Sequence, residues 1–346
     1  MKKVSSTDVA RLAGVSQSTV SFVLNGKKDM SISKETRERV LEAAQQLNYI
    51  HRPTHRSHKP KDLVFGIMVP NLSNLYYANF AQSVELYARE QNIRTIICNT
   101  TRSPEMEELY VKYLIKHGVD GIIYAFTPNI DKELSIPVVV VGESVNTPYS
   151  LISLDSYQSG QMIAEHLYQL GHRKICVISS PTHPKSISSS RQARLKGILD
   201  KFDEYGSRDK VIVCVDPEEH EDIEWTYETM IGQQYADEMM GKHPDITAFV
   251  GINDMIAHGI LSTLQRRGLR VPEDVAVCGF DNSSLAIISS PQLTSIDHYV
   301  VHRGCMAVNF LKDFNLGREK SLDPVVMNYR PKLIVRGSTC LDPPGK

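Results

Sequence analysis

Apolar residues recur every three or four positions through the first fifty residues, which is the spacing of helices with one buried face. The pattern predicts three helices, over residues of about 6–13, 17–24 and 33–48. Gly14 separates the first two, and Ser16 stands where the second needs an N-cap. Two short helices joined by a tight turn are typical of the helix-turn-helix motif, whose second helix enters the major groove of DNA. An ordinary helical hairpin has the same pattern.

From residue 63 to about residue 340, short runs rich in Val and Ile alternate with longer amphipathic segments. Runs that are apolar at every position are typical of parallel strands covered on both faces. The pattern predicts strands over residues 63–69, 95–98, 121–125, 138–141, 175–179, 211–215, 248–251 and 275–279. It predicts helices over residues 76–91, 105–117, 157–170, 190–205, 229–241 and 255–267. This alternation indicates a doubly wound α/β fold that is long enough for two lobes.

Residues 51–62, HRPTHRSHKPKD, separate the two patterns and contain no large apolar residue. Such a segment cannot form a core, so we interpret it as a linker. We therefore expect a helix-turn-helix domain over residues 1–50 and a large domain over residues 63–346. In the large domain we expect a first lobe of about residues 63–160 and 292–324 and a second lobe of about residues 161–291 and 325–340.

The net charge of −1 is unevenly divided along the chain. Residues 1–62 contain 12 Lys and Arg against 6 Asp and Glu, whereas residues 63–346 contain 27 against 34. A basic module on an acidic body predicts a polyanionic partner for the N-terminal module alone. A basic segment by itself is more often solvated surface, but beside a helix-turn-helix pattern it supports binding to nucleic acid.

Several functional classes find no support in the sequence. No apolar run approaches the ~20 residues of a membrane span, and the N-terminus has no apolar signal-peptide core. The six cysteines are scattered, without C-x-x-C pairs or zinc-site spacing. The chain also contains no G-x-G-x-x-G, G-x-x-x-x-G-K-[ST], G-x-S-x-G or H-E-x-x-H motif. We expect a cytoplasmic, nucleoid-associated protein that is not an enzyme and uses no cofactor, metal or membrane.

Longer motifs carry a resemblance to a known family. DVA, AGVS, TVS and VLN stand in one run, followed by TRERVLEAA and LNY. The large domain contains GIMVPNLSN, VDGIIY, HLYQLGHRKICVI, RLKG, GINDMIAHGIL, GLRVPEDVAVCGFD and LTSI. From residue 5 to residue 340 the chain thus resembles the LacI/GalR family of transcriptional regulators. The resemblance implies an N-terminal three-helix helix-turn-helix domain plus an α/β periplasmic-binding-protein-like effector domain of two doubly wound lobes.

Residues at the start of the second helix are expected to contact DNA, because side chains there reach base edges. By position, Gln17, Ser18 and Phe22 would meet bases, with neighbouring polar residues on phosphates. The full set of expected contacts is Thr7, Ser16, Gln17, Ser18, Thr19, Ser21, Phe22, Asn25, Arg52, Arg56 and His58. Members of the family often carry Arg where this chain has Phe22, so we predict the loss of one guanine contact. Phe22 could instead be core, and Asn25 only a helix cap.

The linker departs from the family pattern as well. In the family this segment folds on DNA, and a Leu wedges into the minor groove. Counting without gaps from Tyr49, that position holds His58. We predict that the linker contacts the minor groove through Arg52, Arg56 and His58 but bends DNA less. The alternative is a disordered tether.

The resemblance also implies effector-binding residues in a cleft between the lobes, where the strands end. These residues are Asn74, Tyr76, Tyr77, Asp155, Arg194, Trp225, Asn253 and Asp281. Asp, Asn and Arg side chains bind vicinal hydroxyls, and an aromatic ring gives a sugar a flat face, so a carbohydrate is the expected small-molecule effector. Asn253 and Asp281 could instead only cap helices, and Trp225 could be surface or core.

The mechanism implied by the resemblance is a repressor whose affinity for a two-fold symmetric double-stranded DNA operator changes when effector binds. No heptad repeat follows the last strand-like run, so we expect a homodimer and not a tetramer. Two alternatives stay open. One is a catabolite-control-type regulator with a phosphoprotein or purine-like corepressor, and the other is a sugar-binding receptor without regulation.

Overall fold

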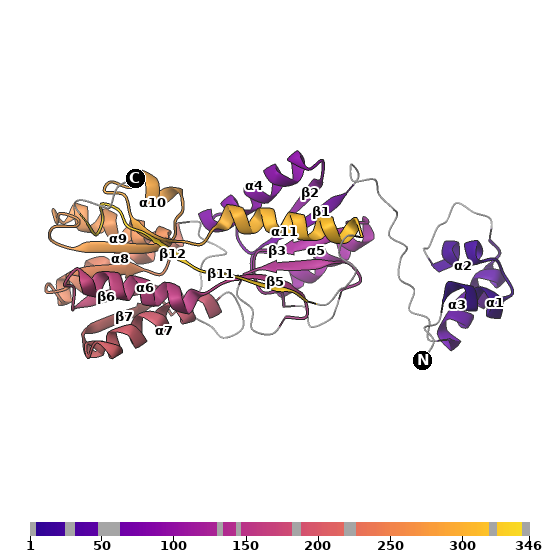
Figure 1. Cartoon of the computed structure of the whole chain (residues 1–346), viewed down its shortest axis with the longest axis horizontal. Coiled ribbons are helices and arrows are strands. Elements are labelled where there is room, and N and C mark those ends of the chain that lie inside the picture. Colours follow the sequence, from indigo (N-terminus) through magenta and orange to yellow (C-terminus); the bar gives the residue numbers. More distant parts are fainter. Residues whose placement is uncertain are drawn as a thin grey trace. The chain divides into compact units, whose positions relative to one another are not determined.

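The structure is a computed structural model (Figure 1). It describes residues 5–24, 32–47, 63–129, 134–142, 147–181, 188–217, 226–317 and 324–340. The chain forms two compact units, Met1–His58 and Lys59–Lys346.

The first unit contains the three expected helices, α1 (Ser6–Ala13), α2 (Gln17–Leu24) and α3 (Lys34–Gln46). A capping box of Ser5 and Asp8 starts α1, and the left-handed Gly14 (φ 63°) ends it, so α2 begins after a sharp turn. Val9, Val20 and Val40, one from each helix, are completely buried in a small apolar core. The predicted boundaries are therefore confirmed to within two residues, because caps and apolar spacing agree.

The second unit contains two six-stranded sheets, one in each lobe. The first sheet has the order β11-β5-β4-β3-β1-β2, and all its neighbours pair in parallel. Its strands are β1 (Val64–Val69), β2 (Arg94–Asn99), β3 (Gly121–Tyr124), β4 (Val138–Val141), β5 (Ser150–Leu154) and β11 (Val326–Tyr329). The eight predicted strands all occur, and the continuous apolar sequences of β3, β4, β6 (Ile175–Ser179) and β8 (Ala248–Gly251) reflect burial on both faces.

The second sheet has the order β12-β10-β9-β8-β6-β7 and is parallel except for the antiparallel edge strand β12. Its strands are β6 (Ile175–Ser179), β7 (Val211–Val215), β8 (Ala248–Gly251), β9 (Ala276–Asp281), β10 (Thr294–Asp297) and β12 (Lys332–Ile334). Its core is continuous through both sheet faces and includes Phe202, Phe249 and Phe280.

Helices cover both sheets (Figure 1). The first lobe carries α4 (Leu75–Glu90), α5 (Pro104–Lys116) and α11 (Val300–Asn315). The second carries α6 (Ser156–Gln169), α7 (Ser188–Glu204), the 3-10 turn η2 (Arg208–Lys210), α8 (Tyr227–Lys242), α9 (Asp254–Arg266) and α10 (Ser284–Ile288). The helix α11 is missing from the pattern-based prediction, although it packs on α4 and strands β3 to β5.

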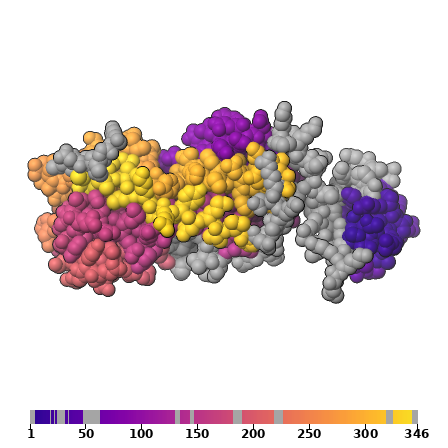
Figure 2. All heavy atoms as spheres, viewed as in Figure 1, coloured from indigo at the N-terminus to yellow at the C-terminus, as the bar shows by residue number. Residues whose placement is uncertain are grey.

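The expected lobe boundaries are wrong near the C-terminal end. The strand β10 was expected in the first lobe but pairs with β9 in the second sheet. The strand β11 was expected in the second lobe but pairs with β5 in the first sheet. The chain therefore crosses between the lobes after β5, after β10 and after β11. Figure 2 accordingly shows C-terminal residues, in yellow, on the surface of both lobes.

Among the described residues, no helix is long and apolar enough to cross a membrane. No group of three or more His, Cys, Asp or Glu side chains in these residues could hold a metal ion. Cys98, Cys176, Cys214 and Cys278 are buried free thiols.

Candidate functional site

The polar residues at the start of α2 are fixed by local hydrogen bonds. The Ser16 hydroxyl accepts the Thr19 amide N–H at 3.1 Å and so caps the helix. The side chain of Gln17 donates from Nε2 to the Ser6 hydroxyl at 2.9 Å, which ties α2 to the start of α1. Thr7, Ser16 and Gln17 are exposed. The start of α2 therefore presents a polar, orientationally restrained surface, as reading of base edges requires.

The structure describes only two of the other predicted DNA-contacting side chains. Thr19 and Ser21 are partly buried on α2. The side chains of Ser18 and Phe22 lie outside the described part of the structure, as do Asn25, Arg52, Arg56 and His58. The predictions for Phe22 as a base-contacting residue and for His58 at the wedge position remain predictions.

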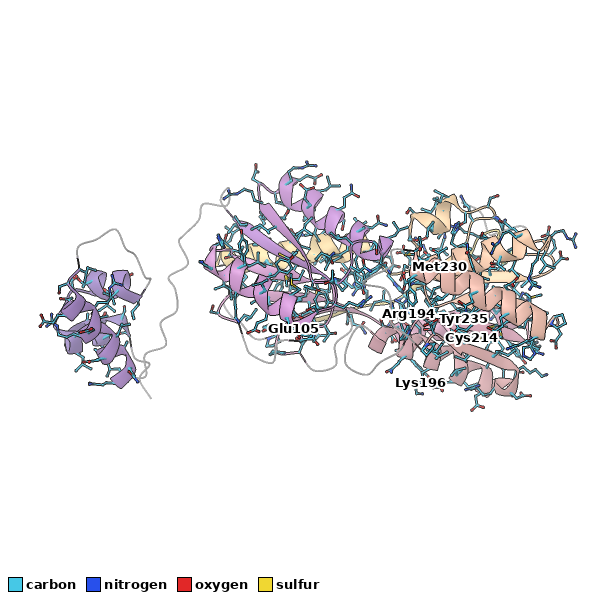
Figure 3. The ribbon with its side chains drawn as sticks, turned by 180° about the vertical axis from the view of Figure 1, so that it is seen from behind. Glu105, Arg194, Lys196, Cys214, Met230 and Tyr235 are labelled. Atoms are coloured by element: carbon cyan, nitrogen blue, oxygen red, sulfur yellow. The ribbon has the colours of Figure 1, made fainter. Side chains whose placement is uncertain are left out.

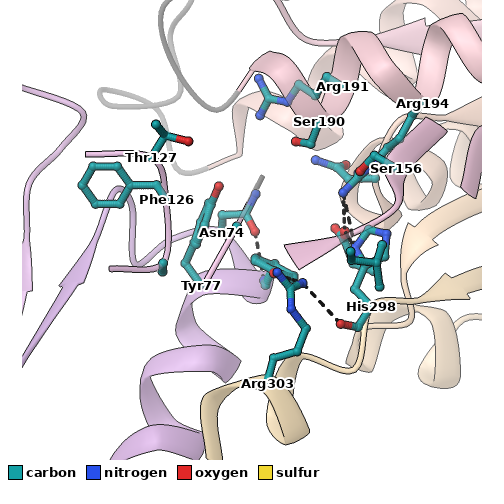
Figure 4. Close-up of a pocket in the computed structure, with 16 residues that line it drawn as sticks. Asn74, Tyr77, Phe126, Thr127, Ser156, Ser190, Arg191, Arg194, His298 and Arg303 are labelled. Atoms are coloured by element: carbon teal, nitrogen blue, oxygen red, sulfur yellow. Dashed lines mark hydrogen bonds and ion pairs between the residues drawn. The ribbon is translucent and has the colours of Figure 1, made fainter. Parts of the chain in front are cut away.

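A second candidate site is a cavity between the two lobes of the large unit (Figure 4). Residues at or just after the carboxyl ends of strands line it from both sheets, which is where doubly wound folds bind ligands. The lining residues are Asn74, Tyr76, Tyr77, Ala125, Phe126, Thr127, Gly142, Leu154, Ser156, Ser190, Arg191, Arg194, Asn253, Asp281, His298 and Arg303.

Six of the eight predicted effector residues line this cavity: Asn74, Tyr76, Tyr77, Arg194, Asn253 and Asp281. Asp155 does not line the cavity, and its carboxylate accepts the Gln158 amide N–H at 2.8 Å and caps α6. Trp225 lies outside the described residues.

The two lobes are joined across the cleft by one buried carboxylate, that of Glu228 on α8. Its Oε2 accepts a hydrogen bond from Nδ2 of Asn74, in the first lobe, at 2.7 Å. Its Oε1 accepts from Nδ2 of Asn253 at 2.6 Å and pairs with Nη2 of Arg191 at 3.1 Å, both in the second lobe. Glu228 is 4% exposed. Nothing in the sequence pattern distinguishes this residue from an ordinary first-turn glutamate, so sequence reasoning missed it.

Asp281, Arg194 and His298 form a second buried group. Nδ1 of His298 lies 2.9 Å from Oδ1 of Asp281, and Nη2 of Arg194 lies 3.6 Å from the same oxygen. Burial raises the pKa of Asp281 to about 6, although the charges of Arg194 and Arg191 oppose that shift. Burial, together with the charges of Arg194 and Arg303, holds the pKa of His298 well below its usual value. The His298 ring is therefore neutral at pH 7.

The hydrogen bonds of His298 define which ring nitrogen carries the proton. Nδ1 also lies 3.3 Å from Nη2 of Arg194. One nitrogen cannot donate to Asp281 and accept from Arg194, so we assign the shorter contact, to Asp281, as the hydrogen bond. Nε2 is then an acceptor, and no described residue is its partner. Arg194 is held independently, because its Nη1 donates to the carbonyl of Ile252 at 2.7 Å.

The cavity therefore offers both apolar surface and hydrogen-bonding groups to a ligand. Tyr76, Tyr77 and Phe126 supply aromatic surface, while the amide, guanidinium and imidazole groups supply donors and acceptors. Figure 3 locates Arg194 at the end of the second lobe next to the first. Such a mixture of apolar surface and a few oriented polar groups is typical of small-molecule sites.

Family models match both the N-terminal helices and part of the large unit. Residues 7–51 match the family model for bacterial regulatory proteins of the lacI family, and residues 164–339 match the periplasmic binding protein-like domain. The chain is 30% identical over 344 residues to the HTH-type transcriptional repressor PurR of Haemophilus influenzae, an alignment covering 96% of this chain and 97% of that protein.

Solved structures show the same architecture. The transcriptional regulator CelR in complex with cellobiose is 25% identical, with a TM-score of 0.65, and the match covers 97% of this chain and 99% of that one. A periplasmic binding protein/LacI transcriptional regulator from Alkaliphilus metalliredigens, in complex with D-xylulofuranose, is 27% identical, with a TM-score of 0.66 over 80% and 99% of the two chains.

The chain belongs to the LacI family of bacterial regulatory proteins. It is a DNA-binding transcriptional regulator that joins a helix-turn-helix domain to a periplasmic-binding-protein-like domain.

Proposed function

We propose that this protein is a repressor whose affinity for operator DNA changes when a small molecule, a carbohydrate or carbohydrate derivative, binds in the cleft. The observation that carries the proposal is the cleft itself, where polar side chains of both lobes meet around Glu228. The sugar complexes of the two structural relatives support a carbohydrate. In this account the protein acts in the cytoplasm, on nucleoid DNA, and has no catalytic role.

We further propose that the functional unit is a homodimer on a two-fold symmetric operator. One three-helix domain contacts only a half-site, and two domains related by a two-fold axis read a palindrome. Ligand in the cleft adds contacts to both lobes and so biases their relative orientation. A change in lobe orientation alters the spacing of the two DNA-binding domains and therefore the operator affinity.

A ligand screen followed by a DNA-binding measurement tests this proposal. Thermal unfolding of the full chain is recorded with sugars, sugar derivatives and nucleobases, because a ligand that binds the folded state raises the melting temperature. The compound that binds is then added to a titration of fluorescent DNA selected from genomic fragments.

We expect a sugar-type ligand to change the dissociation constant for DNA at least ~10-fold, which corresponds to ~1.4 kcal/mol of coupling. An Arg194→Met variant is expected to bind DNA but to lose the response. Stabilisation by nucleobases alone would replace the carbohydrate with a purine-like corepressor. A bound ligand without any effect on DNA binding would refute the regulatory mechanism.

A further inference from the structure

Among the described residues at the cleft, counting Glu228 beside the lining, positive charges exceed negative charges by one. Arg191 is paired with Glu228, and Arg194 is paired with Asp281. The third lining guanidinium, that of Arg303, forms no ion pair with any carboxylate among the described residues. His298 adds no charge because its ring is neutral.

Arg303 lies in the first turn of α11 and is only 3% exposed. Its Nη2 donates to the carbonyl of Ile152 at 2.9 Å. Its Nη1 has two longer contacts, to the Tyr76 hydroxyl at 3.4 Å and to the His298 carbonyl at 3.5 Å. Its Nε has no partner among the described residues. Within the described chain, this buried guanidinium thus has one good neutral acceptor and no carboxylate partner.

Such an arrangement is unfavourable unless another group neutralises the charge, because burial removes the hydration of the guanidinium. The planar fork of an arginine matches the two oxygens of a carboxylate or phosphate. The contacts of Arg303 place this fork at the cleft, beside the Tyr76 hydroxyl and the main chain of His298. Figure 4 shows Arg303 and His298 in the lining.

The groups around Arg303 suit hydroxyls. Nε2 of His298 is a buried acceptor without a partner in the described chain, and a ligand hydroxyl can donate to it. Ser156, Ser190 and Thr127 add hydroxyl groups to the same lining. A ligand that satisfies both features has hydroxyl groups and one negative charge.

We propose that the cleft recognises a polyhydroxylated anion, a sugar acid or a sugar phosphate, whose charged group pairs with Arg303 while a hydroxyl donates to His298. This inference rests on the proposed function, since it specifies the ligand class of the same cleft.

Matched sets of sugars test the proposal on the full chain. One set is D-glucose, D-glucuronate and D-glucose 6-phosphate, and a second is the corresponding galactose series. Binding is measured by calorimetry and thermal unfolding. We expect one anionic member to bind at least ~10-fold more tightly than its neutral parent, which is ~1.4 kcal/mol. The acid and phosphate members show which anion is preferred.

Variants separate recognition of charge from a structural role of Arg303. Wild type is expected to prefer the anion ~10-fold over the neutral sugar, and Arg303→Met is expected to reduce this preference to less than ~3-fold. Arg303→Lys, which keeps the charge without the fork, retains part of it. The matched control is Arg173→Met, since the Arg173 guanidinium also donates to main-chain carbonyls, of Tyr168 and His172, but lies outside the cleft lining. This control keeps the full preference.

The outcomes distinguish this inference from the proposed function. Equal binding of neutral and anionic members, or an undiminished preference in a folded Arg303→Met protein, overturns the inference and leaves the proposed function standing. If no sugar binds, the carbohydrate assignment fails. The anion site is then tested with orthophosphate alone, by its effect on the melting temperature. Greater stabilisation of wild type than of Arg303→Met by phosphate supports the anion site, and equal stabilisation overturns it.

Discussion

Replacing Glu228 by Gln removes the charge that joins the two lobes while keeping the shape of the side chain. Three described side chains, those of Asn74, Asn253 and Arg191, donate to this carboxylate. A glutamine has only one acceptor oxygen, so its amide nitrogen must face one of the donors. Asn74 cannot turn its own oxygen to that nitrogen without cost, because its Oδ1 accepts the Tyr76 amide N–H at 2.9 Å and caps α4.

The expected loss follows from these contacts. Breaking a buried ion pair by removal of one charge costs about 3–5 kcal/mol. Because the amide keeps the packing, we expect the lower end, ~3 kcal/mol. For a domain of this size, ~1 kcal/mol lowers the melting temperature by roughly 2 °C, so the expected decrease is about 6 °C.

Thermal unfolding followed by circular dichroism measures the decrease. The matched control is Glu238→Gln, on the same helix, where an exposed carboxylate pairs with Lys242. Exposed pairs contribute little, so this control should unfold within ~1–2 °C of wild type. A Glu228→Gln protein as stable as wild type, or a control that loses as much, would show that the buried charge of Glu228 does not stabilise the fold.

Three further predictions concern other parts of the chain. In Gly160→Ala the new Cβ would lie 2.0 Å from the Arg194 carbonyl oxygen and force α6 from α7, whereas Gly241→Ala meets nothing within 4 Å. Thermal unfolding should show a loss of ~3 kcal/mol for the first and no loss for the second, and equal effects would contradict the packing. Burial raises the pKa of Asp254 to about 7, above its unfolded value, so its contribution to the free energy of unfolding falls as pH rises from about 4 to about 7. Asp254→Asn should therefore lower the free energy of unfolding, measured by urea titration, most at pH 5 and least at pH 8. A difference between wild type and variant that does not change with pH would contradict the raised pKa. Val20→Ala should lower the free energy of unfolding of the small domain by ~2 kcal/mol. DNA binding should therefore weaken on warming, while sugar binding stays unchanged. A DNA affinity equal to that of wild type up to about 45 °C would contradict this prediction.

The sequence pattern predicts those features that depend on local chemistry. The three helices of the first unit are predicted by apolar spacing and by Ser16 at the start of α2, and the structure confirms both. The parallel strands are predicted because burial on both faces requires continuous apolar runs. Six of the predicted effector residues line the cavity, and all of them except Arg194, which lies within α7, end or follow a strand. Their contact with a ligand stays a prediction.

The features that were missed depend on contacts between distant segments. The sequence pattern assigns β10 and β11 each to the wrong lobe, because the pairing of β10 with β9 and of β11 with β5 is not encoded in the local sequence. Glu228 and Arg303 were missed because helical glutamates and arginines are usually exposed, and only tertiary packing buries them. Asp155 is predicted at the ligand, but it caps α6 and does not line the cavity.

The coupling between cleft and DNA is tested most directly by one titration. The full chain is titrated into its selected DNA with and without the cleft ligand, in wild type and in Arg194→Met. We expect ligand to change the dissociation constant at least ~10-fold in wild type and to leave it unchanged in the variant. Equal DNA affinity of the free and the ligand-saturated wild-type protein would contradict it.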